Sequence, residues 1–143
     1  MQMDREEIKM EWEKASLREA LGKTLLEIGD NVPNMLLVNA DLAGSTQVTY
    51  FMEKYPERTV EVGIAEQNMI GVAAGLATVG KIPFASTFAI FATGRAWEQV
   101  RQSVAYSSVN VKIVATHGGV TVGPDGGSHQ AVEDLALMRV LPN

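Results

Sequence analysis

The chain has 143 residues, of which 46% are hydrophobic and 20% charged, and its formal net charge is −5. This apolar content is typical of one globular domain and too high for a disordered chain. The acidic balance, without a clustered basic surface, argues against nucleic acid as a partner.

The chain has no cysteine, which excludes disulfides, thiol nucleophiles and thiolate metal sites. Residues 1–15 form a charged extension that lacks the apolar core of a signal peptide. No uncharged run approaches the roughly 20 residues that a membrane-spanning helix needs. We therefore expect a cytoplasmic protein with no membrane contact.

Helical and strand patterns alternate along residues 16–143. Ser16 and Glu19 have the spacing of a capping box and open a predicted helix over about 16–29. Four short runs of β-forming residues predict strands: "MLLVNAD", "TVEVG", "IPFAST" and "VKIVATH". Four further segments have helical spacing: "QVTYFMEKY", "EQNMIGVAAGLATVG", "GRAWEQVRQSVAYS" and "HQAVEDLALMRV". This order predicts an α/β fold, a three-layer αβα domain with a mainly parallel sheet.

Polar, glycine-rich and aromatic residues follow the predicted strands. In order they are Asp41 with "AGST", the segment 63–66, Phe88, and His117 with the loop "GGVTVGPDGGS". Parallel sheets bind ligands outside the carboxyl ends of their strands, so the sequence predicts a binding site at this edge.

Glu66 precedes a run with no charge from Gln67 to Gly80. Poor hydration favours the protonated carboxyl, whereas the dipole of a helix N-terminus favours the carboxylate. Residue chemistry alone leaves these two interpretations even. Within the same run, Gly71 and Gly75 are spaced i,i+4, which predicts a tight buried helix interface.

Several candidate site residues also have simpler interpretations. His117, Asp125 and His129 are a possible metal-ligand set, but a glycine-rich loop does not fix ligand geometry. For each histidine alone, a hydrogen-bonded histidine near a helix end is the simpler interpretation, whereas two histidines in one loop at the carboxyl edge of a strand favour function. For Phe88 and Phe91, core packing is the simpler interpretation.

Three segments, "VEVGIAEQNMIGVAAGLA", "PFASTFAIF" and "KIVATHGGVTVGPDGGSHQAVEDLALMRVLPN", resemble the pyrimidine-binding domain of transketolase. The form that the chain resembles is the split, two-chain one, in which this domain lies on a separate carboxyl-terminal subunit. The likeness covers residues 16–143. It implies a thiamin diphosphate enzyme of the pentose phosphate pathway that transfers a two-carbon ketol unit from a ketose phosphate to an aldose phosphate.

The resemblance implies roles toward the cofactor. Glu66 corresponds to the glutamate that hydrogen-bonds N1′ of the aminopyrimidine and favours its imino tautomer, so that the carboxyl shares a proton with the ring. Phe88 and Phe91 correspond to aromatic residues that pack against the pyrimidine, and Asp41 lies at the cofactor edge. Gly94 stands where many transketolases have a further aromatic residue, which predicts a looser pocket.

The resemblance also implies roles toward the substrate. His117 and His129 correspond to catalytic histidines that contact the substrate hydroxyls and the reaction intermediate. Asp125 corresponds to the aspartate that reads the hydroxyl next to the donor carbonyl. Arg18 and Ser45 align with groups that bind the sugar phosphate.

The chain contains no segment like the G-D-G…N motif that holds Mg²⁺ and the diphosphate. In the two-chain form that motif belongs to a diphosphate-binding N-terminal subunit, so the resemblance implies this partner and an inactive chain without it. Family members also self-associate through pyrimidine domains. The family continues past "LPN" into another strand, so we expect a domain truncated at its carboxyl end.

Two alternatives stay open. A 1-deoxyxylulose-5-phosphate synthase has a similar "GIAEQ" motif but typically lacks the "TH" pair that includes His117. A non-catalytic module would bind a partner and complete no site. For Glu61, at the end of the second predicted strand, a structural hydrogen bond near the loop is the expectation.

Overall fold

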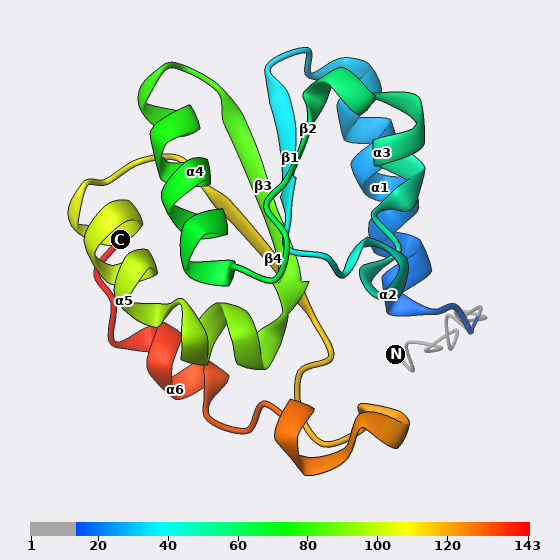
Figure 1. Ribbon diagram of the computed structural model, residues 1–143, viewed down its shortest axis with the longest axis vertical. Helices are drawn as coiled ribbons and strands as arrows, with labels where there is room; N and C mark the ends of the chain where they lie inside the picture. The colour runs from blue at the N-terminus through cyan, green and yellow to red at the C-terminus, as the bar shows by residue number, and fades with distance from the viewer. Residues whose placement is uncertain (1–13) are drawn as a thin grey trace, which may run out of the picture.

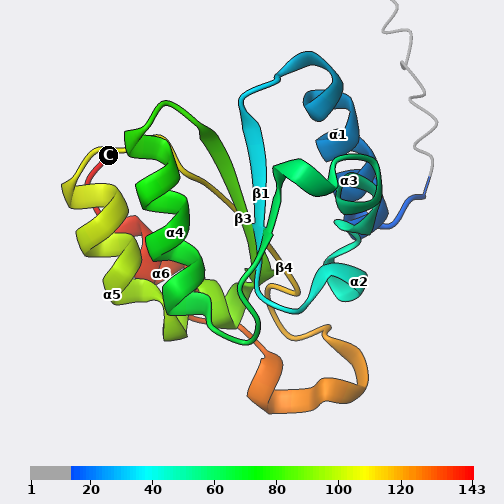
Figure 2. The same cartoon turned by 45° about the horizontal axis from the view of Figure 1, so that its top comes forward.

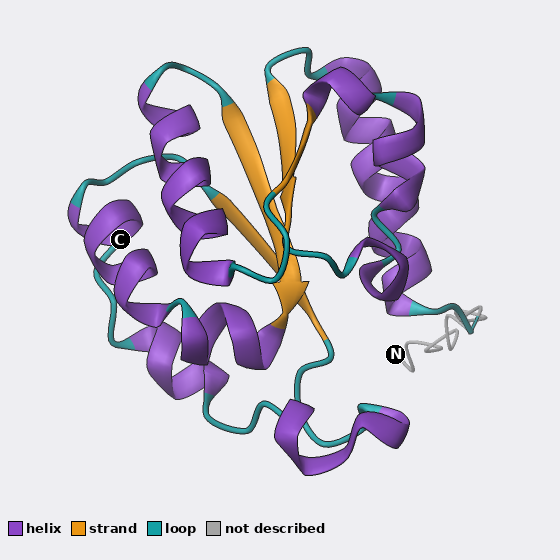
Figure 3. Ribbon diagram, viewed as in Figure 1, coloured by secondary structure: helices purple, strands orange, loops and turns teal. Residues whose placement is uncertain are grey.

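A parallel sheet of four strands forms the centre of the protein (Figures 1 and 3). The computed structural model describes residues 14–143, so residues 1–13 of the expected extension lie outside the described part. The strands are β1 (Met35–Asn39), β2 (Thr59–Glu61), β3 (Ile82–Phe88) and β4 (Lys112–Thr116), in the order β2-β1-β3-β4. All three pairings are parallel, which confirms the predicted architecture.

One face of the sheet is covered by α1 (Leu17–Asn31), α2 (Ala43–Thr46) and α3 (Thr49–Lys54) (Figure 1). The core on this side consists of large apolar side chains at most 1% exposed: Leu25, Met35, Leu37, Val48 and Phe51. The α1 helix approaches the segment after α2 closely at Gly22, where an added Cβ would lie 2.2 Å from the carbonyl oxygen of Gln47.

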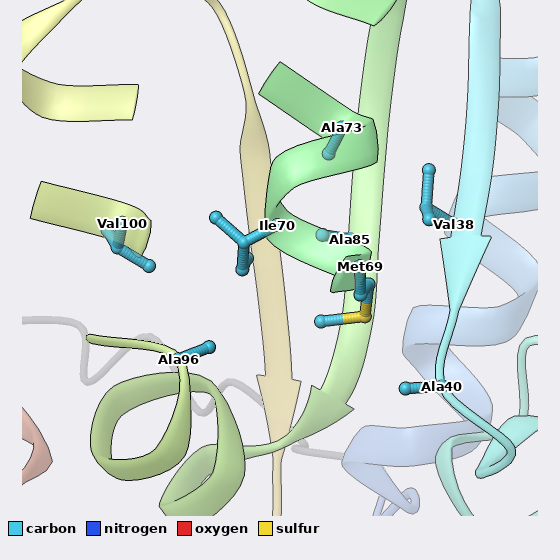
Figure 4. Close-up of a cluster of buried hydrophobic side chains, with 8 residues drawn as sticks. All are labelled: Val38, Ala40, Met69, Ile70, Ala73, Ala85, Ala96 and Val100. Carbon is cyan, nitrogen blue, oxygen red and sulfur yellow. The ribbon is translucent and has the colours of Figure 1, made fainter. Parts of the chain in front are cut away.

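The other face is covered by α4 (Glu66–Thr78), α5 (Trp97–Gln99) and α6 (Asp134–Arg139) (Figure 1). Small and medium apolar side chains from α4, from the strands and their ends, and from the stretch around α5 form the core on this side (Figure 4): Val38, Ala40, Met69, Ile70, Ala73, Ala85, Ala96 and Val100. Small side chains at these positions let α4 lie close to β1 and β3. In the described part of the chain, no helix combines the length and apolarity needed to cross a membrane.

The start of α1 differs from its prediction. Ser16 is the N-cap residue, as expected, but its side chain makes no capping hydrogen bond, so the predicted capping box is wrong. Glu19 instead pairs with Lys23, one turn further on, at 2.7 Å. Leu17 is 89% exposed, and the buried face of the helix is centred on Leu25.

Two predicted helices are interrupted. The segment predicted as one helix over 94–107 belongs to a longer irregular stretch, in which Phe91–Arg95 and Val100–Tyr106 are π-helical on either side of α5. The helix predicted over 129–140 is wrong for residues 130–133, which are not helical, and its α-helical part is confined to α6. The reason is an antiparallel bridge in which Gly119 and Ala131 exchange backbone hydrogen bonds and hold the chain extended before α6.

Candidate functional site

The segments that follow the four strands gather at one edge of the sheet, as predicted. The loop after β4 curves beneath the carboxyl ends of the strands and approaches α2 and the start of α1 (Figure 2). Within this loop Gly123–His129 forms 3₁₀-helical turns. One edge therefore carries residues from five separate parts of the chain.

A cleft of about 620 Å³ lies between this loop and the start of α1. Five residues predicted for the site line it: Arg18, Ser45, Phe88, His117 and Asp125. Nη1 of Arg18 donates a hydrogen bond to the backbone carbonyl of Ser45 at 3.0 Å. The two residues predicted to bind phosphate are therefore neighbours, although 27 positions separate them in the sequence.

An aromatic cluster connects the cleft to the interior. The ring of Phe88 stacks on His117 with centroids 3.8 Å apart and on Phe91 with centroids 5.8 Å apart and an interplanar angle of 7°. His129 meets both phenylalanine rings edge-on, with its centroid 5.4 Å from that of Phe91 and 6.1 Å from that of Phe88. The structure thus brings the two predicted phenylalanines and the two predicted histidines together.

His117 is held in an unusual backbone conformation directly after β4. Its φ angle is 60°, in the left-handed region that non-glycine residues rarely adopt, and the hydroxyl of Thr116 lies 2.7 Å from its Nδ1. Burial lowers the pKa of His117 below the ordinary value of 6.5. The positive charge of Arg18 lowers it further, and Asp125 acts in the opposite direction.

Glu66 begins α4 and is only 1% exposed. Both of its carboxylate oxygens accept hydrogen bonds from Nη1 of Arg95, at 2.9 and 2.8 Å. The guanidinium of Arg95 also lies over the ring of Phe91, 4.4 Å from its centroid. This ion pair supplies the countercharge that a buried carboxylate needs and connects Glu66 to the aromatic cluster.

Arg95 was not predicted as a site residue. It follows Gly94 in a segment predicted as an ordinary helix, and 29 positions separate it from Glu66. Only the tertiary structure places the two side chains together. Gly94 is exposed, and an added Cβ there would have as its nearest neighbour the Cδ1 atom of Ile90, at 3.8 Å. The space beside Gly94 is open.

Glu61 organises the turns at the ends of β1 and β2. Its Oε1 accepts hydrogen bonds from the backbone N–H groups of Asp41 and Gly63, each at 2.8 Å, and its Oε2 accepts one from the side chain of Asn39. The expected structural hydrogen bond is confirmed. Asp41 adopts a left-handed φ of 57° under this restraint and is exposed at the strand end, outside the cleft lining.

The donor set suits an organic cofactor with a flat, nitrogen-containing ring. The buried carboxylate of Glu66 has two acceptor oxygens, which Arg95 contacts here, and the ring of Phe91, backed by the parallel ring of Phe88, is an apolar stacking surface. Among residues 14–143, no three histidine, cysteine, aspartate or glutamate side chains gather as metal ligands. Of the three residues considered as a possible metal-ligand set, His117 and Asp125 line the cleft. The ring of His117 stacks on that of Phe88.

Comparison with known proteins relates the chain to one family. The protein-family model described as "Transketolase, pyrimidine binding domain" matches residues 13–143. A Methanocaldococcus jannaschii protein named for the C-terminal section of transketolase is 58% identical over 127 residues, which are 89% of this chain and 40% of that protein.

Two solved structures are similar as well. A split gene transketolase, described as an inactive β4 tetramer, is 59% identical with a TM-score of 0.75, covering 88% of this chain and 40% of that one. A Pichia stipitis transketolase in complex with sedoheptulose 7-phosphate has a TM-score of 0.82 at 27% identity, covering 93% of this chain and 21% of that one. The chain therefore spans less than half the length of each of these relatives.

Proposed function

The chain belongs to the family of transketolase pyrimidine-binding domains, and from this we propose that it supplies half of a thiamin diphosphate-dependent active site. The reaction we propose is transfer of a two-carbon ketol unit between sugar phosphates. The observation that carries the proposal is Glu66, a buried carboxylate at the sheet edge that is linked through Arg95 to the stacked rings of Phe88 and Phe91.

Glu66 is the group that we assign to N1′ of the aminopyrimidine. Glu66 would hold the ring through a hydrogen bond to this nitrogen, and the bound cofactor would supply a nucleophilic carbon. A carboxyl group that is 1% exposed meets little competition from water for such a hydrogen bond. Phe88 and Phe91 would hold the ring by stacking.

The cleft beside the cluster is the proposed sugar phosphate site. Arg18 and Ser45 lie on one wall and would bind the phosphate, because a guanidinium is a strong phosphate ligand. Asp125 on the opposite loop would read a donor hydroxyl. His117 and His129 would contact the substrate hydroxyls and move protons near the reacting carbons, and the lowered pKa of His117 favours its neutral form, which can accept a proton.

The proposal includes a diphosphate-binding partner subunit that holds Mg²⁺ and the diphosphate. It also includes self-association of this chain, for which the split gene relative, described as a β4 tetramer, offers support. The proposed compartment is the cytoplasm, to which a cysteine-free sequence is suited.

The test is reconstitution. The chain is mixed with its diphosphate-binding partner, thiamin diphosphate and Mg²⁺, and ketol transfer from a ketose phosphate to an aldose phosphate is assayed. Glu66→Ala should lower turnover by about 10²-fold or more, since the proton-sharing contact is lost. Glu53→Ala on the exposed side of α3 is the matched control and should keep full activity.

Two results would contradict the proposal. Turnover that survives Glu66→Ala in a folded chain would remove the role assigned to this residue. Calorimetry that finds partner binding with no dependence on thiamin diphosphate would instead support a non-catalytic module.

A further inference from the structure

The contact between Glu66 and Arg95 occupies both acceptor oxygens of the proposed cofactor ligand. One nitrogen of Arg95 lies 2.9 Å from Oε1 and 2.8 Å from Oε2. The Glu66 side chain is 1% exposed, and that of Arg95 is 47% exposed. The buried partner is therefore fixed within the fold, and the cation reaches it from the solvent side.

The guanidinium makes the two kinds of contact that an aminopyrimidine ring would need. Its central carbon lies over the ring of Phe91, 4.4 Å from the ring centroid, and its N–H group donates to the carboxylate of Glu66. A guanidinium is a flat, delocalised cation that stacks on aromatic rings and pairs with carboxylates. It resembles the cofactor ring in shape and in hydrogen-bonding chemistry.

The backbone around Arg95 is anchored, and its side chain has room to move. Nε2 of Gln67 donates to the carbonyl oxygen of Arg95 at 3.3 Å, and the N–H of Ala96 donates to the carbonyl of Phe91 at 3.1 Å. The preceding Gly94 has no side chain and is exposed. Rotation of the Arg95 side chain toward solvent would therefore free Glu66 without moving the main chain.

We propose that Arg95 occupies the aminopyrimidine position while the chain is without cofactor and leaves it when the cofactor binds. This inference rests on the proposed function. Arg95 and the cofactor ring compete for Glu66 and for the face of Phe91. The ion pair stabilises the unliganded chain. Because only molecules in which the ion pair is open can bind thiamin diphosphate, it also lowers the apparent affinity for the cofactor.

Removal of the guanidinium should lower the stability of the unliganded chain and raise its affinity for the cofactor. In Arg95→Met the unliganded chain loses the partner of a buried carboxylate, so its melting temperature should fall. The dissociation constant for thiamin diphosphate should also fall, by about fivefold, which is the order of magnitude expected for a half-exposed ion pair.

The experiment has two parts with a common set of variants. Thermal unfolding of the chain alone is measured for wild type, Arg95→Met, Glu66→Gln and the double variant, so that a double-mutant cycle gives the coupling between the two side chains. Calorimetric titration of the assembled complex with thiamin diphosphate and Mg²⁺ is measured for wild type and Arg95→Met. Arg101→Met, on an exposed arginine of the same irregular stretch, is the control and should change neither quantity.

Each outcome is decisive. Weaker cofactor binding by Arg95→Met would overturn the inference, because Arg95 would then be a positioning residue that stays in place in the bound state. An absence of coupling in the unfolding cycle would overturn it as well. Should Arg95→Met fail to fold, Arg95→Gln retains an N–H donor without the charge and should bind cofactor more tightly than wild type. A wild-type complex that binds no thiamin diphosphate would overturn the proposed function itself.

Discussion

At the scale of single residues, the site depends on side chains whose neighbours set their chemistry. His117 is the clearest case, because it is stacked on Phe88 and lies near Arg18, Asp125 and His129. Its pKa is lowered, so between the ordinary value of 6.5 and the folded value the unfolded chain binds a proton at this position that the folded chain does not.

This difference predicts a pH dependence of stability. When the unfolded state binds more protons, the free energy of unfolding rises with pH. The contribution of His117 to the free energy of unfolding is therefore fully present above pH 6.5. This contribution is lost as the pH falls from 6.5 toward the pKa of His117 in the folded chain. His117→Gln should show a smaller decrease of unfolding free energy between pH 8 and pH 5 than wild type, as measured by urea denaturation. Parallel curves for the two proteins would contradict the prediction.

At the scale of elements, the position of α1 depends on a glycine. An added Cβ at Gly22 would lie 2.2 Å from the carbonyl oxygen of Gln47 and 2.7 Å from a ring carbon of Tyr50. The first of these atoms belongs to the backbone and cannot move aside easily. The close approach places the segment after α2 against α1, and the same approach brings Ser45 to Arg18.

Gly22→Ala should therefore destabilise the chain by about 2 kcal/mol, as overpacking does in well-packed sites. The measurement is the free energy of unfolding from chemical denaturation. Gly44→Ala, at an exposed α2 position with no atom within 4 Å of the added Cβ, should change that energy by less than about 0.5 kcal/mol. Equal effects of the two substitutions would show that the close approach does not matter.

At the scale of the whole molecule, the outer face of α4 is an exposed surface without charged residues. Gly71 and Gly75 are exposed on it, with no atom within 4 Å of an added Cβ, so the tight contact predicted for them is absent within the described part of the chain. Ile64 and Val79, at either end of α4, are 74% and 72% exposed. This uncharged face is the one that we expect a second copy to cover.

Gly71→Leu should weaken self-association, because the added side chain prevents close approach of another helix. Sedimentation velocity over a range of concentrations measures the effect. Thr24→Leu adds a similar side chain to an exposed position of α1 and should leave association unchanged. A chain that is monomeric at every concentration, or association unaffected by Gly71→Leu, would contradict this assignment.

Much of the fold could be predicted because its elements have strong local signals. The four strands are short apolar runs bounded by turn residues, and all four were located within one or two residues of their observed ends. The capping box at Ser16 failed locally, since Glu19 pairs with Lys23 within α1, and a further failure arose from a tertiary contact. The bridge between Gly119 and Ala131 prevents the helix expected from residue 129, and helical periodicity does not distinguish the π-helical turns after β3 from an ordinary α-helix.

Some residues of the candidate site could likewise be predicted from local sequence signals, and others could not. Because ligands bind at the carboxyl ends of parallel strands, the sequence predicts that Phe88, His117 and Asp125 lie at one edge of the sheet. In the structure they line one cleft at this edge. Arg95 could not be found, because its importance depends on a contact with Glu66 across 29 positions. In the sequence, Glu66 precedes a long uncharged run, and no local pattern indicates that Arg95 is its counter-ion.

The turns at the opposite edge of the sheet are remote from the cleft. Lys81 is exposed there, in the turn between α4 and β3, and its backbone is fixed by a hydrogen bond to Leu76. Since the chain has no cysteine, Lys81→Cys would introduce a unique thiol. A fluorophore attached to it would report tumbling and partner assembly by anisotropy, with all the proposed ligand-binding groups left unmodified at the far end of the strands.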